Sequence, residues 1–155
     1  MEATCIREFW VPYDNKPGYL DVAIGETVNI KESGLVGNQY RIGDASFTRF
    51  AVFWYFRVVN GDIKMNFNDF VDLISGGCYM FSTACKRIDT RTDEDGVEKS
   101  FIHINDIRSG AVADVTVNKK TETIFVRIVR DDKSLEESYN SYEDAFDGIR
   151  AFVGR

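Results

Sequence analysis

The chain has 155 residues, of which 44% are hydrophobic and 14% aromatic. This length and composition suit one globular domain with a sizeable core and exclude a disordered chain. The formal net charge of −6 disfavours broad electrostatic attraction to nucleic acid or to an anionic membrane. We therefore expect a single domain over 1–155 that binds neither membranes nor nucleic acid in general.

The three cysteines, Cys5, Cys78 and Cys85, are an odd number in a chain too large to need disulfide bridges. The N-terminus carries acidic residues where a secretory signal would be basic and then apolar. No apolar run is long enough to cross a bilayer as a helix. These features predict a cytoplasmic protein with reduced thiols.

Short strands and turns are expected up to residue 44. Apolar alternation and turn residues predict strands at 3–12, 19–24, 27–31 and 40–42, turns at 14–18, 25–26 and 43–44, and a loop at 34–38. This succession resembles the small barrels of SH3-like modules.

The apolar run from Phe47 to Val59 predicts the central strand of the sheet. Alternation along such a strand places Thr48, Phe50, Val52, Trp54, Phe56 and Val58 on a core face. The other face mixes aromatic and basic side chains, namely Phe47, Arg49, Phe53, Tyr55 and Arg57 together with Ala51. We choose those five aromatic and basic residues as the candidate binding site.

Three interpretations of this second face are open. It could pack under helices, with its arginines reaching solvent at the strand ends. It could form a protein interface, because aromatic residues and arginine dominate interface hot spots. It could instead stack a base or another flat ligand while arginine binds phosphate.

The rest of the chain predicts more strands and two short amphipathic helices. Asn60-Gly61 is a strong hairpin signal, so Asp62 to Asn66 should pair with the central strand. Further strands are expected at 78–90, 99–105, 112–117, 123–130 and 134–138, and helices at 68–75 and 141–153. Gly76-Gly77 should end the first helix, and Ser141 should cap the second. The predicted class is α+β, mostly antiparallel sheet with two helices packed on it.

An internal repeat is also suggested. The segments beginning at Phe56 and at Val126 both read as strand, tight turn, short strand and amphipathic helix. A duplication would give two similar β-β-α halves with a subdomain boundary near 76–77, and 123–129 would match the central strand. The alternative is coincidence, because a hairpin followed by a helix is a common unit.

Catalytic and metal sites find little support in the residue spacing. His103 is the only histidine, and neither Asp106 nor a cysteine stands at a spacing that indicates a catalytic group. Cys78, Cys85 and His103 do not make a zinc motif, the acidic run at 93–96 lacks calcium-loop spacing, and no glycine-rich phosphate loop precedes a helix. We predict no catalytic residue, no metal and no cofactor.

The leading functional hypothesis is a small non-enzymatic interaction protein that binds a protein partner. A regulator, an inhibitor or an immunity-type protein fits, of the kind that phages and mobile elements encode. Exposed edge strands would also permit a homodimer. The alternative hypothesis is a module that binds a small molecule or nucleotide through the aromatic and arginine face, and a third is a hydrolase or transferase centred on His103.

Overall fold

The structure is a computed structural model that describes residues 1–35, 38–61, 63–75 and 83–154. About half of these residues lie in strands, every sheet is antiparallel, and three helices occur among them, which confirms the predicted α+β class. The chain divides into two compact units, Met1–Lys64 and Met65–Arg155, called here the N-terminal and C-terminal units. A single domain over 1–155 stays a prediction, and the predicted boundary at 76–77 lies outside the described residues.

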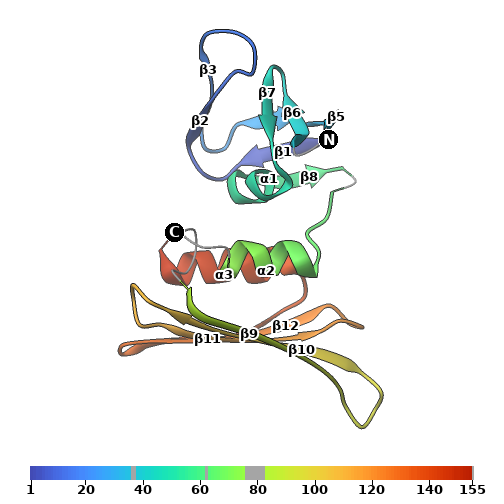
Figure 1. The fold of residues 1–155 in the computed structure, drawn as a ribbon, viewed down its shortest axis with the longest axis vertical. Coiled ribbons are helices and arrows are strands. Elements are labelled where there is room, and N and C mark those ends of the chain that lie inside the picture. The colour runs from blue at the N-terminus through green and yellow to red at the C-terminus, as the bar shows by residue number, and fades with distance from the viewer. Residues whose placement is uncertain (36–37, 62, 76–82, 155) are drawn as a thin grey trace. The chain divides into compact units, whose positions relative to one another are not determined.

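The N-terminal unit contains three small antiparallel sheets and one helix (Figure 1). Its elements are β1 (Glu2–Cys5), β2 (Phe9–Pro12), β3 (Tyr19–Val22), β4 (Thr27–Asn29), β5 (Lys31–Leu35), β6 (Asn38–Ile42), β7 (Ala45–Phe47), α1 (Arg49–Tyr55) and β8 (Phe56–Asn60). β1 lies between β4 and β8, β2 pairs with β3, and β6 lies between β5 and β7. The first and last strands are thus neighbours, while the resemblance to SH3-like barrels stays a prediction.

The predicted central strand over 47–59 is wrong, because Arg49–Tyr55 form helix α1. Thr48 begins the helix as its N-cap, and its hydroxyl accepts a hydrogen bond from the backbone N–H of Ala51 at 3.1 Å. The run is apolar at both the strand and the helix period, so its periodicity cannot distinguish the two. A strand of that length would also exceed the usual 3–10 residues, whereas the observed helix and β8 divide it.

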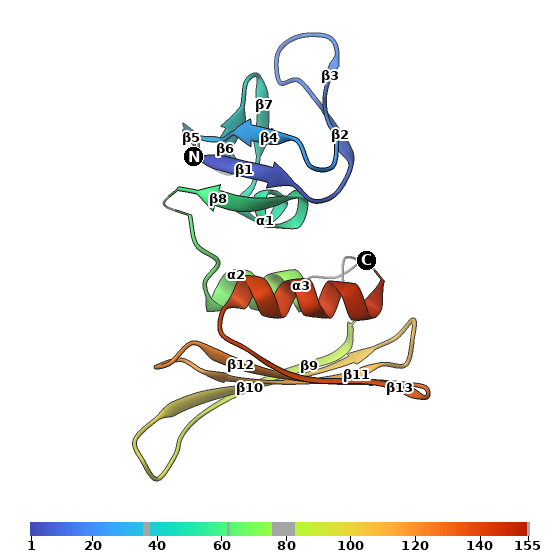
Figure 2. The same ribbon diagram turned by 180° about the vertical axis from the view of Figure 1, so that it is seen from behind.

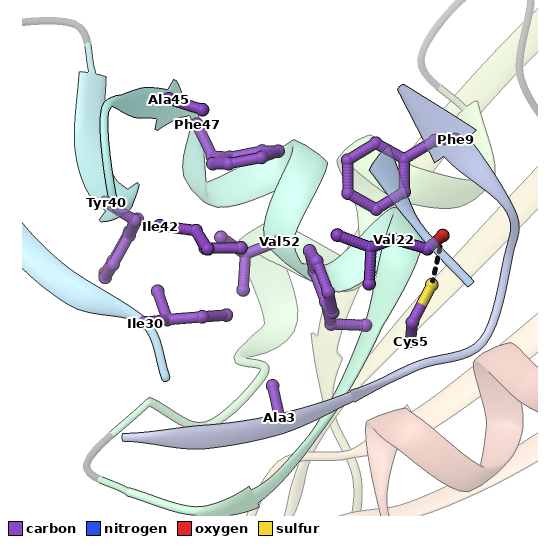
Figure 3. Close-up of a cluster of buried hydrophobic side chains, with 11 residues drawn as sticks. Ala3, Cys5, Phe9, Val22, Ile30, Tyr40, Ile42, Ala45, Phe47 and Val52 are labelled. Carbon is purple, nitrogen blue, oxygen red and sulfur yellow. Dashed lines mark hydrogen bonds between the residues drawn. The ribbon is translucent and has the colours of Figure 1, made fainter. Parts of the chain in front are cut away.

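The core of the N-terminal unit is built around aromatic rings (Figure 3). The ring of Phe9 lies edge-on to Phe47 and Phe56, at centroid distances of 5.8 and 5.3 Å. The thiol of Cys5 is buried beside them and donates to the Val22 carbonyl at 3.7 Å. Burial raises the pKa of the Cys5 thiol, so this cysteine is a packing residue and a poor nucleophile.

The C-terminal unit is a five-stranded sheet with two helices on one face (Figures 1 and 2). Its elements are α2 (Phe67–Ser75), β9 (Thr83–Thr92), β10 (Glu98–Asp106), β11 (Val112–Asn118), β12 (Thr123–Arg130), β13 (Lys133–Tyr139) and α3 (Tyr142–Val153). The strands follow chain order from β9 to β13, each antiparallel to the next. The predicted strands at 99–105, 112–117, 123–130 and 134–138 and both predicted helices are confirmed, while 78–82 lie outside the described residues.

Alternation along the strands decides which side chains face the helices. On β10, β11 and β12 the buried positions are Ser100, Ile102, Ile104, Asp106, Ala113, Val115, Val117, Ile124, Val126 and Ile128. The intervening side chains point to the side of the sheet that neither α2 nor α3 covers. We call this second side of the sheet the open face.

Both helices of the C-terminal unit begin at side-chain caps. Asn66 and Asp69 cap α2 reciprocally, because each side chain accepts the other's backbone N–H at 2.9 Å. Ser141 caps α3 as predicted and accepts from the backbone N–H of Asp144 at 3.1 Å. These bonds satisfy amide groups that have no partner inside a helix.

The structure gives no evidence of two similar halves. β8 pairs with β1 in the N-terminal unit, whereas α2 belongs to the C-terminal unit, so the first supposed copy is split between units. The predicted hairpin after Asn60-Gly61 is also absent, since residues 63–66 form no strand. By contrast, β12, β13 and α3 follow one another within the C-terminal unit.

Gly148 tests how closely α3 packs on the sheet. A Cβ atom at this position would overlap the hydroxyl and ring of Tyr139 on β13. At an exposed helix position, replacing glycine by alanine stabilises the helix by about 1 kcal/mol, because alanine has the higher helix propensity. We expect Gly148→Ala to lose roughly 1–3 kcal/mol of unfolding free energy instead, as overpacked cores do, measured by urea denaturation.

Tyr139→Leu in the same chain should remove the overlap and recover part of the loss. The matched control is Ala151→Gly at an exposed position of α3, which should cost only the propensity term. A Gly148→Ala variant as stable as the wild type would contradict the close packing.

The turn between β9 and β10 depends on the carboxylate of Asp93. Its Oδ1 accepts backbone N–H groups from Val97 at 2.9 Å and Asp95 at 3.0 Å, and Lys99 Nζ lies 3.4 Å from Oδ2. The hydrogen bond from Val97, followed by the Lys99 contact, holds the pKa of Asp93 below its ordinary value.

Because the folded pKa is the lower one, the stability gained from this carboxylate is complete above the ordinary aspartate pKa of about 3.9. It is lost as the pH falls through the folded pKa. We expect the Val97 amide resonance to shift below pH ~4 in the wild type and to stay constant in Asp93→Asn, which keeps an acceptor but has no charge. A midpoint at or above the ordinary value would contradict this account.

Candidate functional site

The five residues chosen from the sequence do not share one face. Phe47 is a core residue of β7, and Arg49 and Phe53 lie one turn apart on α1, with the guanidinium 5.3 Å from the ring centroid. The ring of Tyr55 packs against the ring of Phe9, with 4.4 Å between their centroids, and Arg57 lies on β8 opposite Thr4. The alternation that grouped them does not exist, because α1 replaces the predicted strand.

Arg49 nevertheless lines a real cavity. Its Nη1 donates to the hydroxyl of Tyr40 at 3.2 Å and its Nη2 donates to the carbonyl of Lys64 at 3.0 Å. The cavity has a volume of about 370 Å³ and is lined by Met1, Ile30, Lys31, Glu32, Tyr40, Arg49 and Ile63. This volume lies near the lower end of the range of small-molecule pockets.

The chemistry of the cavity suits a ligand with a negative group and an apolar part. Lys31 and Arg49 bring two positive charges against the single carboxylate of Glu32. Tyr40 brings a hydroxyl, and Ile30 and Ile63 bring apolar surface. Sequence reasoning selected Arg49 as part of a strand face, whereas it lies on α1. The same reasoning did not select Tyr40 or Lys31. These two come from β6 and β5, and no local spacing connects them to α1.

An exposed aromatic pair lies on the β2–β3 hairpin. Trp10 is 68% exposed and Tyr19 is 60% exposed, and their rings meet edge to face at a centroid distance of 4.9 Å. Phe9 and Val22 of the same hairpin are buried, so alternation sends Trp10 and Tyr19 outward. We call Trp10 and Tyr19 the aromatic pair.

The loop that joins β2 to β3 is held against the turn between β6 and β7. The backbone N–H of Asp14 donates to the carbonyl of Asp44 at 2.9 Å, and Ser46 Oγ donates to Asp14 Oδ2 at 2.5 Å. Lys16 Nζ lies 2.8 Å from Asp44, and this hydrogen bond lowers the pKa of the Asp44 carboxyl. These contacts fix the hairpin that carries the aromatic pair.

His103 lies on the open face of the C-terminal unit. Its Nδ1 lies 2.6 Å from Asp114 Oδ1, and the two residues are direct cross-strand neighbours on β10 and β11. From the sequence, Asp106 was the candidate carboxylate partner of His103. In the structure Asp106 faces the helices and accepts hydrogen bonds from Ser109. A histidine and a carboxylate alone do not make a catalytic group, so catalysis at His103 stays an untested hypothesis.

Comparisons with family models, with curated proteins and with solved structures find no match to the chain. Among the residues that the structure describes, no three His, Cys, Asp or Glu side chains gather in a way that could hold a metal ion. Within the same residues no helix is both long and apolar enough to cross a membrane. The aromatic pair, the cavity at Arg49 and the open face are the candidate binding surfaces among the described residues.

Proposed function

We propose that the protein is a non-enzymatic binding protein that acts on a protein partner as a cytosolic regulator or inhibitor. The observation that carries the proposal is the exposed aromatic pair on the β2–β3 hairpin. Tryptophan and tyrosine are the residues most enriched in interface hot spots, because they bury a large area at little cost in side-chain entropy.

Two further features support the aromatic pair as an interface. Contacts of the 13–18 loop with Asp44 hold the hairpin in place, so little ordering is needed on binding. Asp21 is exposed and lies directly opposite Trp10 on the hairpin, which supplies a charged side chain beside the rings. The buried free thiol of Cys5 supports the cytosolic setting.

Affinity purification with quantitative mass spectrometry tests this proposal. Trp10→Ala/Tyr19→Ala removes both rings from an exposed surface, so the fold should be retained, as thermal unfolding can confirm. Loss of a hot-spot pair costs at least about 2 kcal/mol, and we expect recovery of the partner from host lysate to fall at least about tenfold.

The matched control is Val59→Ala, which trims another exposed apolar side chain of the N-terminal unit, 64% exposed on β8. It should recover the partner as the wild type does. Equal recovery by the wild type and by the aromatic double variant would contradict the proposal.

A second candidate function is binding of a small anionic molecule, such as a nucleotide, in the cavity at Arg49. The fixed guanidinium beside the Tyr40 hydroxyl favours it. Calorimetry with nucleotides should then show binding below ~1 mM, and Arg49→Gln should weaken it by roughly ten- to a hundredfold, as loss of a charged hydrogen bond does.

Arg57→Gln is the matched control for this experiment, because Arg57 does not line the cavity. It should leave the affinity unchanged. No heat of binding at millimolar nucleotide would exclude this second function and leave the aromatic pair untouched.

A further inference from the structure

One row of side chains on the open face, four charged ones and His103, crosses all five strands and is called here the charged row. The pairing registers place Arg87, His103, Asp114, Arg127 and Glu136 opposite one another, from β9 to β13. The charges alternate in sign along Asp114, Arg127 and Glu136. Nδ1 of His103 lies 2.6 Å from Oδ1 of Asp114. The register of β10 to β13 is favoured by the His103–Asp114 hydrogen bond and by the opposite charges of Arg127 and its neighbours Asp114 and Glu136.

The rows on either side of this charged row are mixed and partly apolar. One row contains Asn105, Val112, Val129 and Ser134, and the other contains Phe101, Thr116, Phe125 and Ser138. Val129 is 41% exposed and Phe125 is 37% exposed. The open face is therefore a broad surface with apolar side chains flanking a central line of charge.

We propose that the open face binds the open face of a second copy of this chain through a two-fold axis. The axis runs parallel to the strands, between β11 and β12. Such a rotation keeps each row opposite itself and reverses the order of the strands, so β11 faces β12 and β10 faces β13 of the other copy. In the charged row, Asp114 then meets Arg127 and His103 meets Glu136, each twice.

The flanking rows are complementary under the same rotation. Val112 meets Val129 in one row, and Thr116 meets Phe125 in the other. Phe101 and Asn105 meet the small hydroxyls of Ser138 and Ser134. Apolar contacts thus lie on both sides of the charge pairs, as in the centre of packed sheets about 10 Å apart and aligned within about 30°.

Several other two-fold axes bring like charges together, and the axis between β12 and β13 overlaps only two strands. An axis along the row would set Asp114 on Asp114 and Arg127 on Arg127. An axis parallel to the strands at β11 repeats the Asp114 clash, one at β12 repeats the Arg127 clash, and one between β10 and β11 sets Arg87 on Arg127. A dimer about the axis between β11 and β12 overlaps four strands of each copy and sets Asp114 against Arg127 and Glu136 against His103, with no like charges opposed.

The overlap is small for a protein interface. Four strands at a spacing of about 4.8 Å and seven residues with a rise of about 3.3 Å give roughly 400 Å² per copy in projection. Standard interfaces bury about 800 Å² per partner, so we expect a dimer that dissociates at micromolar concentrations. The dimer should also weaken as salt screens the charge pairs.

Sedimentation equilibrium of the full chain between ~10 and 500 µM tests the proposal. The wild type should change from the 17.7 kDa monomer towards a dimer of twice that mass. Asp114→Arg and Arg127→Asp should each be monomeric, with dissociation constants raised at least tenfold. The double variant Asp114→Arg/Arg127→Asp should dimerise again, because both interchain pairs are restored with their charges exchanged.

Mixing the two single variants gives the sharpest result. Every Asp114–Arg127 contact between an Asp114→Arg chain and an Arg127→Asp chain joins opposite charges, so a heterodimer should form from two monomeric proteins. Lys120→Glu, a charge reversal at the exposed turn between β11 and β12, is the matched control and should dimerise like the wild type. Val129→Lys places a charge against Val112 of the other copy and should also abolish the dimer.

Circular dichroism and thermal unfolding test whether each variant is folded. If a charge-reversal variant is unfolded, Val129→Lys replaces it as the variant expected to be monomeric. A wild type that stays monomeric at 500 µM would overturn the proposal. So would single variants that dimerise as the wild type does, or a mixture that gains no heterodimer.

Discussion

The C-terminal unit depends on the fact that its sheet buries one face only. Helices α2 and α3 supply apolar surface to a single side, so alternation makes every second residue of β10, β11 and β12 a core residue. The remaining side chains must be compatible with water. The charged row meets that demand, since His103 is hydrogen-bonded to Asp114 and Arg127 lies between the carboxylates of Asp114 and Glu136 on its neighbouring strands. The same arrangement specifies the strand register and makes the surface able to pair with itself.

Much of the C-terminal unit could be predicted from the sequence, because its patterns are unambiguous. The strands at 112–117 and 123–130 are rich in β-branched residues and flank a polar turn, and α3 combines a serine cap with an apolar stripe. The run at 47–59 could not be assigned in this way, since aromatic residues fill it at both periods. The local N-cap bond of the Thr48 hydroxyl and the packing of Val52 and Phe56 in the N-terminal core favour a helix followed by a strand there, and the packing is a tertiary fact.

Candidate sites were harder to predict than elements. Arg49 lines a cavity whose other polar groups come from β5 and β6, and only the folded chain brings them together. The aromatic pair had no clear local signal, because residues 9–12 are all apolar and the sequence does not tell which of them faces outward. The charged row had none, because its five members are spread from Arg87 to Glu136 and meet only through four successive registers.

The dependence of the open face on register limits how the gene can tolerate insertions and deletions. Loss of one residue within β11 or β12 would turn Asp114 or Arg127 toward α2 and α3 and turn a valine or isoleucine outward. Frame-preserving length changes should therefore be confined to the turns. The exposed tip at Glu94-Asp95 extends from the β9–β10 hairpin and carries little of the core, which makes it a suitable place for a tag or fluorescent label.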